Sequence, residues 1–381
     1  MNFKKSKIRS LVLLALAAVA FCGLIWFANK DRPVYRSSNM AGTDYEVGRV
    51  LRVVEDHKTV DEEMDGIWRG SMTLEVEILT GRYKGDTAIV ENYFSSLYNV
   101  RVAEGDKVSI RIDTTGEDEY QVSVYNYYRI PQMIGCIVAF VLLLVLIGGK
   151  KGAKSVAGLA FTVVCILWIL LPLALKGYSP LAVTILLILV CNFVSFFLID
   201  GISTKTVVAA IGSMLGVLAG AVFALIAQNA MSITTYQMDE AETLLLITST
   251  TELKIRDLFL CGILISCMGA VMDVAMSICS AVAEIHQVDR SLGMAKLFAS
   301  GMNIGRAMGT MANTLILAVA GTSLNMMLMI YSYDVSFQQL MNTDFVAIEI
   351  IQCIAGSVGI VCTVPLVALL SAAVFGKKTK K

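Results

Sequence analysis

Charged residues and prolines are scarce in this sequence of 381 residues. Only 16% of the residues are Asp, Glu, Lys or Arg, whereas 56% are hydrophobic, and this balance excludes an ordinary soluble domain. Proline occurs only 5 times, so it rarely interrupts the long apolar runs. The formal net charge is zero, which argues against a nucleic-acid partner. The composition favours a membrane protein.

The sequence also lacks the common signatures of a catalytic centre. It contains no HExxH, no G-x-S-x-G and no P-loop, and its only histidines are His57 and His286. The Gly-Asp pairs that an intramembrane aspartyl protease needs within a helix occur only at 85–86 and 105–106, in expected turns. We therefore expect no enzymatic activity and no cofactor.

The cysteines give no sign of a metal site. All 9 lie within apolar runs, and none lies between residues 29 and 130. They show no CxxC or Cys/His spacing, so we expect no bound metal and no disulfide in that segment. The simplest interpretation is that they are small apolar packing residues.

Eight apolar runs are long enough to cross about 30 Å of hydrocarbon. They lie at roughly 11–28, 131–148, 155–174, 180–199, 206–228, 258–283, 307–330 and 347–373. The first run fits either a cleaved signal peptide or an uncleaved anchor. We favour the anchor, because Asn29, Lys30 and Asp31 follow the run where a signal peptide would show an A-x-A site.

Basic residues gather in alternate loops between these runs. The short loops on one side hold only Lys176, Lys254 and Arg256, whereas the other side holds the basic N-terminus, Lys150, Lys151, Lys154, Lys205, Arg290, Lys296, Arg306 and the basic C-terminus. By the positive-inside rule, both termini are expected to be cytoplasmic.

The segment between the first two runs has a different composition and is expected outside the cytoplasm. Alternating apolar and polar residues predict five strands, at 47–54, 73–78, 87–90, 108–112 and 121–125. Five short strands suggest a small β-barrel of the OB or barrel-sandwich type. The predicted fold is therefore a mainly α polytopic bundle with this β-domain after the first helix. Its expected parts are an anchor 1–28, a β-rich domain 29–130, a seven-helix domain 131–375 and a basic tail 376–381.

Two glycine faces are expected to pack helices closely. Gly212, Gly216 and Gly220 recur every four residues, and so do Gly301, Gly305 and Gly309. Small residues at this spacing let helix backbones approach each other within a membrane. A moving hinge or a pore lining is the alternative interpretation of these glycines.

The sharpest functional signal is a polar line in the sixth run. Asp273, Ser277, Ser280 and Glu284 are spaced i, i+4, i+7 and i+11, which places them on one face of a helix. A carboxylate at membrane depth costs roughly 2.5 kcal/mol or more, so ionisable residues there usually serve a function. The line therefore predicts an ion, proton or substrate site, unless Asp273 only hydrogen-bonds Asn313 or Ser277 to hold helices together.

Two further polar lines follow in the last two runs. One comprises Asn303, Arg306, Thr310 and Asn313, and the other contains Glu349 and Gln352. The sixth run descends and the seventh ascends, so Glu284 and Arg306 are expected together at the cytoplasmic boundary. Asp273 should then lie about 16 Å above Glu284.

Two blocks that contain these lines resemble a known family. GAVMDVAMSICSAVAEI (269–285) and LFASGMNIGRAMGTMANTLILAVAGTSL (297–324) look like the YibE/F family of bacterial polytopic membrane proteins. The resemblance implies a bacterial plasma-membrane protein with a transport-like role and names no substrate.

The leading hypothesis is a permease that moves an ion or small solute along a polar path lined by the last three helices. The alternative is a membrane receptor or assembly scaffold whose outer β-domain binds a protein partner. The expected surroundings are membrane lipid in both cases, and no sequence feature fixes the oligomeric state.

Overall fold

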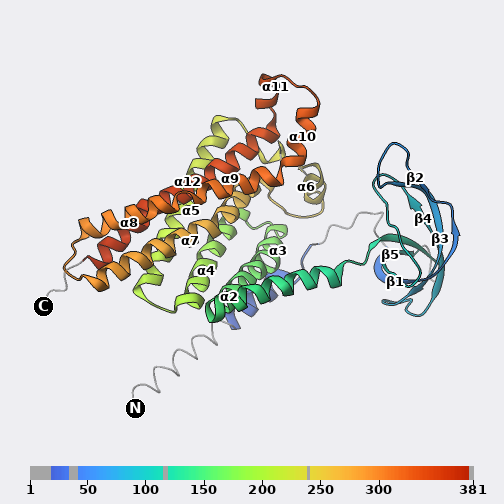
Figure 1. The fold of residues 1–381 in the computed structure, drawn as a ribbon, viewed down its shortest axis with the longest axis horizontal. Helices are drawn as coiled ribbons and strands as arrows, with labels where there is room; N and C mark the ends of the chain where they lie inside the picture. The colour runs from blue at the N-terminus through green and yellow to red at the C-terminus, as the bar shows by residue number, and fades with distance from the viewer. Residues whose placement is uncertain (1–18, 34–41, 115–118, 238–240, 377–381) are drawn as a thin grey trace, which may run out of the picture. The chain divides into compact units, whose positions relative to one another are not determined.

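A computed structural model of the chain describes residues 19–33, 42–114, 119–237 and 241–376. The chain divides into two compact units (Figure 1). A β unit comprises Arg36–Leu143, and a helical unit comprises Met1–Tyr35 together with Leu144–Lys381. The first part of the expected anchor and most of the expected basic tail lie outside the described residues.

The β unit is a curled antiparallel sheet. Each of the five predicted strands is present, longer than expected, and a short two-residue strand is added. The strands are β1 Thr43–Asp56, β2 Thr59–Val60, β3 Trp68–Ile78, β4 Thr87–Phe94, β5 Lys107–Thr114 and β6 Tyr120–Tyr127. Their order is β2-β3-β1-β5-β6, with β4 also paired to β3, and β4 contacts β6. This contact between strands at opposite ends of the sheet gives the curled, barrel-like form.

The alternation of β3 and β5 builds the core of this unit. Leu74, Val76 and Ile78 of β3 are fully buried, as are Val108 and Ile110 of β5. Gly48 lies on β1 between these two strands, and a Cβ there would lie 2.6 Å from Val76 and 3.0 Å from Ile110. A side chain at this position would therefore force the curl open.

The helical unit begins with the helix Val19–Asn29. The remaining helices are α2 Ile130–Cys165, α3 Leu171–Leu175, α4 Pro180–Asp200, α5 Thr204–Ala230, α6 Ala241–Thr248, α7 Leu258–Val288, α8 Met294–Met308, α9 Met311–Thr322, α10 Leu324–Ser332, α11 Phe337–Met341 and α12 Asp344–Phe375. A π-helical turn, Ile166–Leu170, joins α2 to α3. Residues 130–143 of α2 belong to the β unit, and the rest of α2 belongs to the helical unit.

Five helical segments of the described chain are long and apolar enough to cross a membrane, and a sixth is added if one bent pair counts as a span. Two of the eight expected runs, 131–148 and 155–174, form one helical stretch of 46 residues, Ile130–Leu175. Gly149 breaks this stretch with a φ of 54° and a ψ of −134°, a backbone conformation that glycine adopts without strain. The bend is sharp enough that a Cβ on Gly152 would overlap the carbonyl of Leu144.

The seventh expected run is displaced along the chain. Hydropathy places it at 307–330, but the helix begins at Met294, continues through α8 and α9 to Thr322, and bends by 58° into α10. The reason is that α8 is amphipathic, because Leu297, Gly301 and Gly305 are buried while Asn303 and Arg306 are exposed. A hydropathy average over such a helix hides its buried apolar face.

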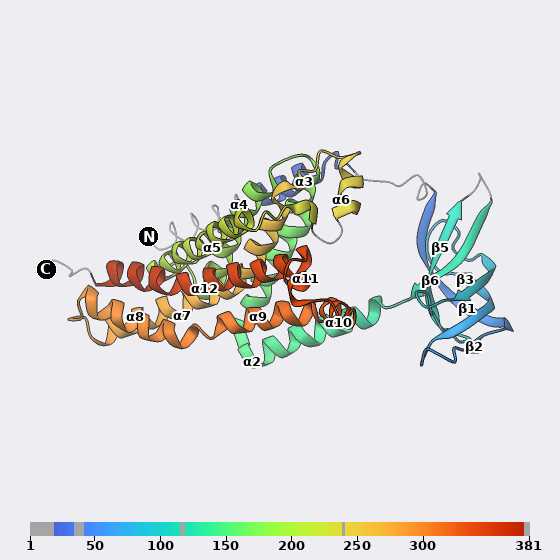
Figure 2. The same ribbon diagram turned by 90° about the horizontal axis from the view of Figure 1, so that it is seen from above.

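Helix α12 packs between α5 and α8, as Figure 2 shows. On one side, Cβ atoms added at Gly212 and Gly216 of α5 would overlap Val367 and Thr363, and one at Gly220 would lie 2.9 Å from the Ala355 carbonyl. On the other side, Gly301 lies against Ala368 and Gly305 lies against Val364. Both faces thus bring backbones close to α12. Gly309 differs, because it lies at the junction of α8 and α9 and has only carbonyls of its own turn nearby.

Candidate functional site

The polar residues of α7 lie on the helix face that points away from the helical unit. Asp273 and Glu284 are exposed, and Ser277 and Ser280 are half-buried. The opposite face is fully buried and includes Val271, Ala275 and Val282. Asp273 lies fifteen residues from each end of Leu258–Val288, or about 22 Å. The carboxylate therefore stands midway along an apolar helix, where contact with lipid costs roughly 2.5 kcal/mol or more.

The same face continues toward the start of α7 with small residues. Gly262, Ser266 and Gly269 are exposed and precede Asp273 at the same helical spacing. A Cβ added at Gly262 or Gly269 would meet nothing within 4 Å. This extension could have been found in the sequence, because Gly262, Ser266, Gly269 and Asp273 follow one another in steps of three or four residues. Together Gly262, Ser266, Gly269, Asp273, Ser277, Ser280 and Glu284 form what we call the α7 polar face.

A second exposed polar line runs along α8 and α9. It comprises Asn303, Arg306, Thr310 and Asn313, all of which are exposed. Arg306 donates from Nη1 to the Asn303 side-chain oxygen at 3.3 Å. In the described chain, Asp273, Glu284 and Arg306 form no ion pair, and no hydrogen bond joins Asp273 to Asn313 or Ser277.

The packing of α8 on α7 fixes the depth of Arg306. Gly301 lies against Val282, and Gly305 lies against Ile278, so the two helices run antiparallel in a defined register. Arg306 is therefore level with Ser277, one helical turn from Asp273. Sequence reasoning expected Arg306 beside Glu284, and this pairing was wrong because α8 begins before the hydropathy scan detects it.

The polar residues of α12 do not join these two lines. Glu349 and Gln352 are half-buried, and Glu349 Oε2 is buried without a hydrogen-bond partner. Gly356 packs on Cys267 of α7, and this contact sets the relative depth of the two helices. Glu349 then lies about 20 Å from the level of Asp273. The structure thus brings the polar lines of α7 and α8 to similar depth and leaves Glu349 near the other end of the bundle.

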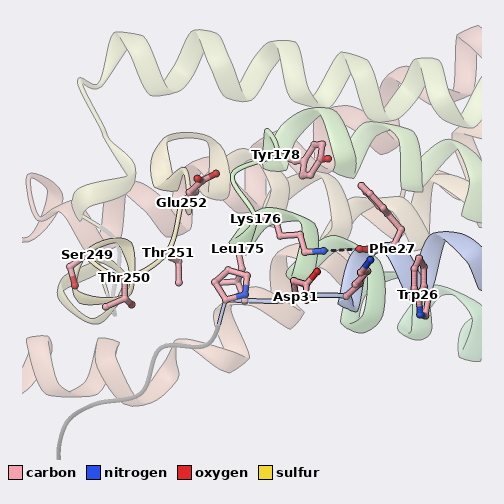
Figure 3. A pocket seen from close by; sticks show the side chains of 12 residues that line it. Trp26, Phe27, Asp31, Leu175, Lys176, Tyr178, Ser249, Thr250, Thr251 and Glu252 are labelled. Atoms are coloured by element: carbon pink, nitrogen blue, oxygen red, sulfur yellow. Dashed lines mark hydrogen bonds between the residues drawn. The ribbon is translucent and has the colours of Figure 1, made fainter.

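A pocket of about 830 Å³ lies elsewhere in the helical unit. Its walls come from the end of the N-terminal helix, from Leu175, Lys176 and Tyr178 at the end of α3 and just after it, and from residues 249–252 (Figure 3). Lys176 Nζ donates to the Phe27 carbonyl at 2.6 Å and lies 5.3 Å from the Phe27 ring centre. Gly177 has a φ of 85° and lies against Glu252. Glycine therefore lets these two loops meet.

Charged and aromatic side chains share this pocket. Lys30 lies 5.0 Å from the Trp26 ring centre, and the lining also includes Asp31, Lys176 and Glu252. These four charged groups form no ion pairs with one another in the described structure. Sequence reasoning missed the pocket, because its walls are three segments far apart in the chain and none of them carries a motif.

Two family models match the chain. The model described as YibE/F-like protein matches residues 136–377, and the one described as YibE/F family N-terminal domain matches residues 40–127. The chain belongs to the YibE/F family. The resemblance seen in the two sequence blocks is thereby confirmed. No curated protein and no solved structure was found to match.

The YibE/F models cover the two polar lines but only part of the pocket. The α7 polar face and the residues of α8 and α9 fall within 136–377, and the strands of the β unit fall within 40–127. The pocket wall formed by Trp26, Phe27, Lys30 and Asp31 lies before both matches. Within the described residues of this YibE/F chain, no three His, Cys, Asp or Glu side chains are grouped to hold a metal ion.

Proposed function

We propose that this YibE/F protein is a permease that moves an ion or a small solute along the polar surface of α7, α8 and α9. The observation that carries the proposal is the position of Asp273, which is exposed midway along an apolar helix long enough to cross a membrane. A carboxylate at this depth needs water, a cation or a polar partner around it. A hydrated path supplies such surroundings.

The proposed path runs the length of the α7 polar face. Ser277 and Ser280 offer hydroxyl groups below Asp273, and Glu284 offers a second carboxylate near the end of the helix. Arg306 of α8, level with Ser277, is an exposed cation at a similar depth. The sequence contains no ATP-binding P-loop, so an ion gradient or a separate subunit would drive active transport. We assign no enzymatic step to this protein.

The proposed setting is the bacterial plasma membrane, with eight crossings, cytoplasmic termini and an extracytoplasmic β unit. Two observations support the number of crossings. Gly149 divides the 46-residue stretch into two segments that are each long enough to span, and Lys150, Lys151 and Lys154 follow the break. The pocket near Lys176 would then face outward and serve as a first binding point for the solute.

Reporter fusions test this arrangement. A reporter after Gly152 should report the cytoplasm, and a reporter after Thr114 should report the opposite side. Activity of a phosphatase that works only outside the cytoplasm provides the measurement. The same side for both fusions would contradict the proposed topology.

The transport proposal is tested by profiling ions and small solutes in cells with and without the protein. Asp273→Asn keeps the size of the side chain and removes its charge, so cells with this variant should resemble cells without the protein. The matched control is Asp334→Asn, which makes the same chemical change at an exposed loop residue. Asn tolerates the positive φ of 49° at that position.

The outcomes separate the two hypotheses. No solute difference between cells with and without the protein would contradict the permease. A wild-type profile from Asp273→Asn would remove Asp273 from the path. The alternative function is a receptor or assembly scaffold that binds a protein partner at the β unit. The exposure of the α7 polar face on the surface of the helical unit is also compatible with this alternative. That alternative predicts loss of a bound protein and no change in solutes.

A further inference from the structure

A second pocket, of about 320 Å³, lies within the β unit at the point where β6 leads into α2. We call it the β6–α2 pocket. One wall is formed by Val102, Asp106 and Lys107, before and at the start of β5. The other wall is formed by Tyr127, Tyr128, Arg129, Pro131 and Gln132. The pocket therefore joins the sheet to the first turn of α2.

Hydrogen bonds hold the second wall in place. The Tyr127 hydroxyl accepts from the Arg101 backbone N–H at 2.7 Å and donates to the Asn99 carbonyl at 3.3 Å. The Arg129 guanidinium lies 5.2 Å from the centre of the Tyr127 ring. Because the ring is fixed at its hydroxyl end, the cation stacked on it has a defined position beside the pocket.

The charges of the pocket favour an anion. Lys107 and Arg129 are exposed, and neither forms an ion pair within the described residues. The lining contains one carboxylate, Asp106, whose Oδ2 accepts from the Ala103 backbone N–H at 2.8 Å within its own turn. Two unpaired cations against one carboxylate that is already hydrogen-bonded give the pocket a net positive charge.

The length of the first part of α2 sets the depth of the pocket. From Ile130 to the break at Gly149 the helix rises about 28 Å. The hydrocarbon of a bilayer is about 30 Å thick, so this segment must use its whole length to cross. Its first turn, with Pro131 and Gln132, then lies where the hydrocarbon meets the headgroups. This step rests on the crossing of α2 that we proposed above, and it does not require transport.

We propose that the β6–α2 pocket binds the phosphate of a phospholipid headgroup, with Lys107 and Arg129 donating hydrogen bonds to its oxygens. Phosphate is the anion that a bilayer presents at this depth, and a guanidinium matches its geometry. Tyr127 and Tyr128 are of the residue type that is enriched at this boundary. A lipid bound here ties the β unit to the surface of the bilayer.

Lipid binding to the full-length protein tests this proposal. The protein is stripped of lipid in mild detergent and titrated with phosphatidylglycerol, and native mass spectrometry follows each bound lipid. Wild type should bind one lipid more tightly than the rest. Lys107→Gln and Arg129→Gln should each weaken this first step about tenfold, because each removes a charged hydrogen-bond donor. Arg129→Lys keeps the charge and should weaken it less than Arg129→Gln.

Two further probes separate the phosphate from the chains. Diacylglycerol with the same acyl chains lacks the phosphate and should not fill the site. Inorganic phosphate lacks the chains and should not displace the lipid at equal concentration. Equally tight binding of diacylglycerol would assign the site to apolar contacts, and equally tight binding of inorganic phosphate would assign it to a free anion. Either result would overturn the proposal.

The matched control is Arg82→Gln. Arg82 is also an exposed arginine beside a tyrosine, 5.7 Å from the ring centre of Tyr83. Tyr83 stacks on Tyr120 at the start of β6, about 23 Å along that strand from Tyr127. Lipid binding by this variant should equal that of wild type.

Two results of this comparison would also overturn the proposal. One is an equal loss of lipid in Arg82→Gln and Arg129→Gln, which would indicate a general effect of charge. The other is undiminished binding by both Lys107→Gln and Arg129→Gln. The reporter fusions after Gly152 and Thr114 test the crossing of α2, and solute profiles test transport. The lipid site can therefore fail while both of those proposals stand.

Discussion

Two helices of this protein carry similar lines of small residues, and only one of these lines is filled. On α5, Gly212, Gly216 and Gly220 lie directly against α12, and added Cβ atoms would collide with it. On α7, Gly262 and Gly269 follow a comparable spacing, but nothing lies within 4 Å of a Cβ built there. The spacing of glycines thus predicts that a helix can approach, and it does not say which helix does so.

The residues that accompany the glycines explain the difference. The α5 line is flanked by apolar residues such as Val208 and Val217, which are buried with α12 and α7 in one core. The α7 line contains Asp273, whose carboxylate is costly to bury in an apolar core and is stabilised by water or by an opposite charge. The chain therefore completes the first contact by itself and leaves the second open.

The largest expected effect is on the filled line. Gly216→Val should destabilise the protein by about 3 kcal/mol or more, because the added atoms would overlap Thr363 and the Gly359 carbonyl lies 3.1 Å from an added Cβ. Thermal unfolding of the purified protein, followed by size-exclusion chromatography, measures the loss. The matched control is Gly262→Val on the open line, where the unfolding temperature should stay near that of wild type. An equal decrease in unfolding temperature for both variants would contradict the proposed difference between the filled and the open line.

A smaller effect on folding is expected at the charged residue of the open line. Asp273→Asn should change the free energy of unfolding by no more than about 0.5 kcal/mol, because Asp273 has no partner within the described chain. Transport should nevertheless fall sharply. Unfolding curves and solute profiles of the same variant separate the two effects. A loss on the order of 3 kcal/mol would instead reveal an ion pair within the chain.

The smallest change is expected at Ser277, which is half-buried on the same face. Ser277→Ala removes one hydroxyl from the polar line at little cost in volume, so stability should stay within about 0.5 kcal/mol of wild type. Transport should fall partially, and solute profiling measures the decrease. Full activity and normal stability in both Ser277→Ala and Asp273→Asn would mean that the polar line is incidental.

Local patterns in the sequence were enough to predict several parts of the structure. The alternation at 73–78 and 108–112 predicted the strands that became β3 and β5, because the period of two depends only on neighbouring residues. The line from Asp273 to Glu284 does lie on one helix face for the same reason. The beginning of α8 was missed, because its apolar side is narrow and a hydropathy average includes Asn303 and Arg306.

The sequence by itself determined the membrane class, the family, the strands and the positions that share a helix face. These features follow from composition and from short periodic spacing, which survive in any tertiary arrangement. Only the tertiary structure decided that the α5 glycines face α12, that Arg306 lies level with Ser277, and that three distant segments meet at the pocket. Such contacts join residues far apart in the chain, and their pairing depends on which surfaces fit together and not on any local pattern.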